Sequence, residues 1–176
     1  MAPSDIVAQP QPAISDEDLA AFFGNKAEYY LTEKEILERS GSLISWNWPA
    51  FLFNFLWMYY RKMWAQGTLT AFISIILSAS IVFNWGVGIV MLVVGMYGNG
   101  IYVTHARKKV VEIALAGGNP DRRPESLAKA GGTTWIPVVI GFFVTIGLTI
   151  LLIVLWGGMV MAAFGGWLWW ELFTDP

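Results

Sequence analysis

The sequence contains no cysteine, and two long stretches of it contain no charge. Without cysteine the chain can form no disulfide and no thiolate metal site, and it has no cysteine nucleophile. Asp, Glu, Lys and Arg are absent from residues 63–104 and again from residues 130–170. A domain folded in water cannot hide two such stretches, because much of any small chain must face the solvent. We therefore expect an integral membrane protein.

Charge is scarce overall and nearly balanced. Charged residues make up 14% of the chain, whereas soluble domains carry about 25%. A net charge of −2 provides no field that would attract nucleic acid, so we expect no nucleic-acid partner. Residues 1–14 contain Asp5 but no basic residue, and Pro10 and Pro12 interrupt any apolar run. This pattern predicts a disordered tail on the cytoplasmic side rather than a secretory signal.

Residues 15–41 are predicted to form amphipathic helices at the cytoplasmic surface of the membrane. Ser15, followed by Asp18, is typical of a helix start, and Gly24 and Gly41 are the expected ends of two short helices. The expected apolar face of the first helix carries Leu19, Phe22 and Phe23.

Residues 46–64 form an aromatic segment that is too short to cross a bilayer. Pro49 suits a first helical turn, and the residues from 50 to 60 are apolar except Asn54. Such a helix rises only about 17 Å, against a hydrocarbon core of about 30 Å. Trp and Tyr concentrate at the headgroup level. We expect an interfacial or shallow re-entrant helix, with Arg61 and Lys62 at the lipid phosphates.

Three transmembrane helices are predicted. Residues 67–103 form a hairpin of two spans, residues 104–134 a basic cytoplasmic loop, and residues 135–156 the third span. Residues 157–176 are expected to form an interfacial extension and tail. A fourth span over residues 158–173 stays open as an alternative.

The basic residues predict the orientation, because Lys and Arg accumulate in short cytoplasmic loops. With three spans all eleven basic residues lie on one side. The predicted topology places the N-terminus in the cytoplasm and the C-terminus outside, in a multi-pass protein of a bacterial inner membrane.

No catalytic, cofactor-binding or metal site is predicted. His105 is the only histidine, and one imidazole cannot build a structural metal site. No ionisable residue lies inside a predicted span, although proton relays and ion-coupled transporters usually need one. Residues expected to contact lipid or a partner protein are Trp46, Trp48, Trp57, Tyr60, Arg61, Lys62, Asn99, His105, Arg107, Lys108 and Lys109.

Small residues repeat along two of the predicted spans. Thr70, Ser74 and Ser78 share one helical face, and Gly141, Thr145 and Thr149 share another. Such faces let helices approach closely. They suit packing within this chain and docking to another membrane protein equally well.

The segment from Ile44 to Trp64 resembles the signature of a bacterial family of small inner-membrane proteins that is known only as a domain of unknown function. In that family a Trp-Asn-Trp-x-Ala-Phe core leads into Trp-x-x-Tyr-Arg-Lys-Met. Gly98-Asn99-Gly100 is similar to the element that closes the family's second span, and the likeness covers roughly residues 20–115. At the position of Asn54 the family commonly holds glycine. The resemblance implies a bacterial inner-membrane location and no particular activity.

The sequence favours a non-catalytic accessory, assembly or scaffold subunit of a larger membrane protein complex. Its partners would be membrane lipids and other integral membrane proteins. A lipid-binding or membrane-organising protein is one alternative, and a small transporter or channel subunit is another. An enzyme is not expected.

Overall fold

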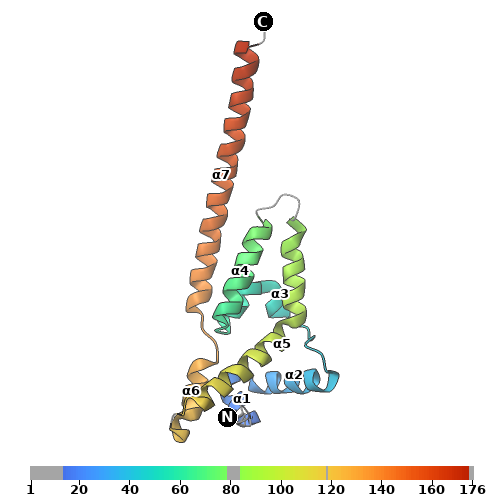
Figure 1. Cartoon of the computed structure of the whole chain (residues 1–176), viewed down its shortest axis with the longest axis vertical. Coiled ribbons are helices and arrows are strands. Elements are labelled where there is room, and N and C mark those ends of the chain that lie inside the picture. Colours follow the sequence, from blue (N-terminus) through green and yellow to red (C-terminus); the bar gives the residue numbers. More distant parts are fainter. Residues whose placement is uncertain (1–13, 79–83, 118, 175–176) are drawn as a thin grey trace, which may run out of the picture. The chain divides into compact units, whose positions relative to one another are not determined.

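The computed structural model describes residues 14–78, 84–117 and 119–174, and all regular secondary structure in these ranges is helical (Figure 1). The predicted all-α class is confirmed for this part of the chain. The first of two compact units ends at Trp135, and the second contains α7, Ile136–Thr174. The helices of the first unit are α1 (Asp16–Phe23), α2 (Ala27–Ser40), α3 (Trp48–Tyr60), α4 (Trp64–Ser78), α5 (Asn84–Leu115) and α6 (Arg123–Ala130), with 3-10 turns at Gly24–Lys26 and Pro120–Arg122.

Helix α1 begins where the sequence predicts, and α1 and α2 both end at the predicted glycines, whereas α2 begins at Ala27 and has no side-chain cap. The Ser15 hydroxyl accepts a hydrogen bond from the Asp18 amide at 3.1 Å and so caps α1. Gly24 and Gly41 follow the ends of α1 and α2 with φ values of 62° and 61°, which glycine adopts without the strain that a Cβ would impose. The predicted apolar face of α1 is buried in the core.

Helix α5 organises the first unit, because α1, α2, α3, α4 and α6 all contact it. It has 32 residues and is therefore about 48 Å long. Figure 1 shows that α5 bends, with α4 beside its first part and α1, α2 and α6 around its second part. The core gathers on that second part. Its buried apolar residues are Leu19, Phe22, Phe23, Tyr30, Leu37, Ala50, Trp57, Met58, Met63, Val94, Tyr102, Val103, Ala106, Val110 and Leu127.

The aromatic helix α3 is interrupted at its centre. Asn54 has φ 46° and ψ −121°, a conformation that glycine adopts far more readily than other residues. The glycine that the resemblance leads us to expect at this position would fit this backbone conformation. Pro49 lies in the first turn, and the Asn47 side chain caps the helix by accepting from the Ala50 amide at 2.9 Å. The two short pieces pack against α4 and α5 (Figure 1).

Three glycines of α5 allow the chain before and within α3 to lie directly on the helix. A Cβ atom added at Gly100 would lie 2.4 Å from the Leu43 carbonyl oxygen. One added at Gly98 would lie 2.8 Å from Cβ of Ala50. The close approach lets Asn47 donate its backbone N–H to the Gly95 carbonyl at 2.8 Å. The segment is thus held by main-chain hydrogen bonds as well as by packing.

Two described helices are long and apolar enough to cross a membrane, Trp85–Leu115 of α5 and Ile136–Trp167 of α7. Part of the predicted first span, residues 79–83, lies outside the described residues. The described apolar part of α4, Trp64–Leu77, is shorter than a bilayer requires. Helix α7 continues unbroken through Gly157 and Gly158, so residues 158–173 belong to the same helix as residues 136–156.

The predicted loop over residues 104–134 is mostly helical. Helix α5 continues to Leu115, and α6 packs against α1. Arg123 donates to the Asp18 carboxylate at 2.6 Å, and Leu127 is fully buried. Helix α6 has eight residues, too few to show a clear apolar period, so its burial depends on tertiary contacts that the sequence does not reveal.

The glycine contacts predict opposite effects for two alanine substitutions in α5. We expect Gly100→Ala to destabilise the protein by about 1–3 kcal/mol, because the new methyl group overpacks against the Leu43 backbone. Gly88→Ala is the control, because nothing lies within 4 Å of a Cβ added there. It should be neutral or stabilising by about 0.5 kcal/mol. Thermal unfolding of both variants in detergent measures the difference, and equal midpoints would contradict the close approach.

Candidate functional site

A buried amide, Asn99, links the segments that meet on α5. Its side chain is fully buried, and its Oδ1 atom accepts from Nδ2 of Asn47 at 2.6 Å. Its Nδ2 atom donates to the Tyr29 hydroxyl at 2.9 Å and to the Ser45 hydroxyl at 3.1 Å. Ser45 in turn donates to the Glu33 carboxylate. One amide therefore connects α2, the segment before α3, and α5.

This arrangement explains why a polar residue stands in an apolar helix. A buried amide that lost its partners would leave unpaired groups at a cost of about 1–3 kcal/mol each. Both polar atoms of Asn99 have partners in the structure. The chain gains a specific register between α5 and the segment before α3, because a shift of one residue would remove Asn99 from its partners. Sequence predicts Asn99 at a lipid or partner contact; in the structure its side chain is buried within this chain.

The structure differs from the sequence expectation at Arg61, which lies in a cage of tyrosine rings rather than at the lipid phosphates. Only 6% of Arg61 is exposed. The guanidinium carbon lies 4.7 Å from the ring centroid of Tyr30, 5.1 Å from that of Tyr102 and 5.7 Å from that of Tyr60. These distances are typical of cation–π contacts. Helices α2, α3 and α5 each supply one ring.

The rings surround the guanidinium, but they leave two of its nitrogen atoms without a hydrogen-bond acceptor. Nε and Nη1 of Arg61 are buried without a hydrogen-bond partner among the described residues, and so is the Tyr102 hydroxyl. Arg61 also forms no ion pair within this part of the chain. Each cation–π contact contributes about 2 kcal/mol when it is desolvated. Removing the charge from water costs several kcal/mol, and a missing hydrogen-bond acceptor adds to that penalty.

The Tyr30 phenol beside Arg61 does not supply a negative charge. Burial raises the pKa of Tyr30 well above its ordinary value, and the nearby Arg61 guanidinium only partly opposes this rise. Burial likewise raises the pKa of Tyr29. Both phenols therefore stay neutral at physiological pH, and neither is a tyrosinate partner for Arg61.

The turn after α3 is fixed to the segment that follows α6. Lys62 has a positive φ of 58°, and its ammonium group donates to the Lys129 carbonyl at 2.9 Å. The Thr134 amide donates to the Tyr60 carbonyl at 2.9 Å. The Tyr60 and Trp135 rings have centroids 4.8 Å apart. Lys62 is thus half-buried, and its ammonium group is hydrogen-bonded to the segment after α6.

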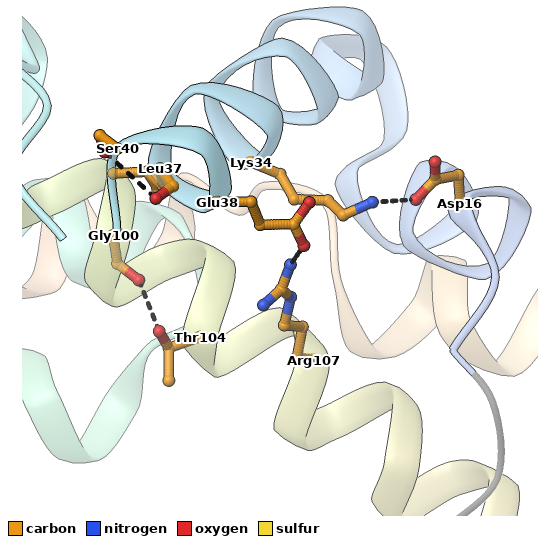
Figure 2. A network of polar contacts seen from close by, with 8 residues as sticks. All are labelled: Asp16, Lys34, Leu37, Glu38, Ser40, Gly100, Thr104 and Arg107. Atoms are coloured by element: carbon orange, nitrogen blue, oxygen red, sulfur yellow. Dashed lines mark hydrogen bonds and ion pairs between the residues drawn. The ribbon is translucent and has the colours of Figure 1, made fainter. Parts of the chain in front are cut away.

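Ion pairs tie α2 to its neighbours on the outer side of the first unit (Figure 2). Lys34 pairs with Asp16, and Glu38 pairs with Arg107 of α5. Thr104 of α5 donates to the Gly100 carbonyl at 2.8 Å. Such partly exposed pairs contribute about 0–1 kcal/mol each. Arg107, expected from sequence at a lipid or partner contact, already has a partner within the chain.

The other predicted contact residues divide between surface and interior. Trp46, Trp48 and Lys108 are exposed, whereas Trp57 is buried and packs its ring against Tyr102. His105 is half-buried, with Nδ1 3.3 Å from Nε2 of Gln66. Lys109 pairs with Glu112 at 2.6 Å. For the exposed residues of the set, a contact with lipid or a partner protein stays a prediction.

The sequence does not identify several residues of the site. Tyr29, Tyr30 and Tyr102 have the pattern of ordinary residues in amphipathic or apolar helices, although Tyr30 and Tyr102 contact Arg61. Asn47 precedes Trp-Pro and so suits a helix cap, but its bond to Asn99 spans 52 positions. From sequence alone, a basic residue at the end of an apolar helix indicates contact with lipid headgroups. The sequence does not reveal that distant tyrosine rings surround Arg61.

These features define a small all-helical protein with two helices long and apolar enough to cross a membrane. The chain belongs to the family described as "Protein of unknown function (DUF2628)", whose sequence profile matches residues 21–108, half of the chain. The matched residues include Asn47, Arg61 and Asn99 and end within α5. This confirms the resemblance to a family of unknown function. No curated protein and no solved structure matches the chain.

The hydrogen bonds of Asn99 predict a large effect for its removal. Asn99→Ala should destabilise the protein by about 2–4 kcal/mol, because it leaves the buried Asn47 amide without its acceptor and opens a small cavity. Asn25→Ala, at an exposed position, removes the same group and should change stability by less than about 0.5 kcal/mol. Thermal unfolding in detergent compares the two. Similar midpoints would show that the buried amide does not hold the helices together.

Proposed function

We propose that this chain is a non-catalytic accessory, assembly or scaffold subunit of a larger membrane protein complex in a bacterial inner membrane. The observation that carries the proposal is α7. This helix forms a unit of its own, and none of its apolar window is buried. Its 39 residues extend about 58 Å, well beyond a hydrocarbon core of about 30 Å.

The surface of α7 suits contact with another helix. Thr145 and Thr149 donate their hydroxyl groups to carbonyls of the preceding turn, at 2.7 and 2.8 Å. Their polar groups are therefore satisfied within the helix and do not hinder close packing. Gly158 and Gly165 are seven residues apart, so they share a second face, and nothing lies within 4 Å of a Cβ added at either position. Small residues at such positions allow helix backbones to approach.

The first unit supports the same proposal because several of its polar side chains bind one another and so join its helices. Asn99 and Asn47 join α5 to the start of α3, and ion pairs join α2 and α6 to their neighbours. Such an arrangement produces a rigid base for membrane helices. A rigid base that carries apolar helices suits the positioning of other membrane proteins.

For the topology we propose three spans, with the N-terminus in the cytoplasm. Helix α4 and the link after it would form the first span, the apolar part of α5 the second and α7 the third. Arg61 and Lys62 precede α4, and Arg122, Arg123 and Lys129 precede α7. The basic cluster that follows the apolar part of α5 lies on the same side in this arrangement, as the distribution of Lys and Arg in cytoplasmic loops requires.

Co-purification tests the proposed role. The full chain, extracted from its native membrane in gentle detergent, should retain a partner at a fixed stoichiometry. Gly158→Leu with Gly165→Leu should reduce the retained partner at least about tenfold, because the larger side chains prevent close helix contact. Ala163→Leu adds similar bulk on the opposite face of α7 and should retain the partner. A chain that is monomeric throughout, or variants that behave alike, would count against the role.

Protease accessibility tests the topology. A cleavable tag placed after Pro176 should be cut in intact spheroplasts, whereas the same tag before Met1 should be cut only after the inner membrane is broken. Protection of the C-terminal tag in intact spheroplasts would contradict three spans, because it places both ends in the cytoplasm.

A further inference from the structure

We infer that Arg61 and Tyr102 form an anion-binding site that takes a phosphate group. This goes beyond the proposed role as a subunit and does not depend on it. The guanidinium of Arg61 is planar, and its N–H groups point outward in that plane. The rings of Tyr30, Tyr60 and Tyr102 surround it at 4.7–5.7 Å. These ring contacts do not give Nε and Nη1 of Arg61 the hydrogen-bond acceptor that they lack.

The unpaired groups at this place are all able to donate hydrogen bonds. They are Nε and Nη1 of Arg61 and the hydroxyl of Tyr102. Buried polar groups nearly always have partners, so an unpaired set of this kind calls for one. A ligand that complements three donors offers acceptors alone. Phosphate meets this requirement, and its oxygens match the paired N–H groups of a guanidinium.

The charges around the site also favour an anion. Arg61 has no ion-pair partner among the residues that the structure describes. Lys62 is the next residue, and its ammonium group lies 2.9 Å from the Lys129 carbonyl. Lys62 therefore adds one further basic residue next to Arg61 in the chain. Asp16, Asp18 and Glu38 are paired with other cations. The site therefore keeps a positive charge that an anion would neutralise.

Arg61 is the residue that follows the last turn of α3, and 6% of its surface is exposed, so a ligand reaches its buried nitrogen atoms only if the neighbouring side chains move. The neighbouring Tyr60 and Lys62 are half-buried. The phosphate of an anionic phospholipid and a free phosphate ion share the chemistry that this site recognises. The experiment distinguishes these two sources.

The test uses the full chain in a maltoside detergent and follows its thermal unfolding midpoint. Three additions are compared: dioleoyl phosphatidylglycerol, dioleoyl phosphatidylcholine, and sodium phosphate against sodium chloride at equal ionic strength. A lipid phosphate at Arg61 predicts a rise in the midpoint with phosphatidylglycerol that exceeds the rise with phosphatidylcholine. A free phosphate predicts a rise with sodium phosphate over sodium chloride. If neither comparison shows a rise, the inference is overturned.

Two variants localise the effect. Arg61→Gln should weaken the response to the effective anion at least about tenfold in half-saturating concentration, because it removes the charge-assisted hydrogen bonds. Lys26→Gln removes one charge from an exposed position outside the predicted contact residues and should respond as the unaltered chain does. Equal responses of both variants would overturn the site, because they indicate general surface charge. If Arg61→Gln does not fold, Arg61→Lys replaces it. This variant keeps the charge but loses the planar fork, and an unchanged response from it would also overturn the inference.

Discussion

The close contact between α5 and the chain that runs from Leu43 to Phe51 is the constraint on which the first unit depends. Glycines remove the side chains that would keep the two segments apart, and Asn99 provides the hydrogen bonds that hold them in register. Neither feature suffices alone. Without the glycines the Asn47 backbone could not reach the Gly95 carbonyl. Without Asn99 only the main-chain hydrogen bonds and the packing would hold the segment on α5.

The Arg61 cage follows from this contact. Seating the start of α3 on α5 determines where α3 ends, and Arg61 immediately follows its last residue. The break at Asn54 turns the second piece of the helix so that Trp57 and Arg61 reach Tyr102. Helix α2 closes the cage because Tyr29 binds Asn99 and the adjacent Tyr30 stacks over Arg61. The polar link and the cation therefore act on the same three helices.

How far the sequence predicts this structure depends on whether a feature is local. The cap at Ser15, the glycine ends of α1 and α2 and the apolar face of α1 follow from neighbouring residues, and all agree with the structure. The family was also identified from local motifs. Arg61 could not be placed, because its surroundings come from tyrosines at positions 30 and 102. The burial of α6 was missed for the same reason, since Leu127 is buried only through its distant contacts.

Helix α5 is continuous, but the exposure of its apolar side chains differs between its first and second parts. Exposed apolar residues such as Ile89 and Leu92 occupy its first part, whereas Tyr102, Ala106 and Val110 are buried under other helices in its second part. Asn99 and its flanking glycines lie between the part of α5 with exposed apolar residues and the part that other helices bury. A polar group at that point is tolerated because the segment before α3 covers it completely. The same segment brings Trp46 and Trp48 to the outer surface, where amphipathic rings suit a membrane interface. The contact that completes the core of the base thus also determines where its aromatic surface lies.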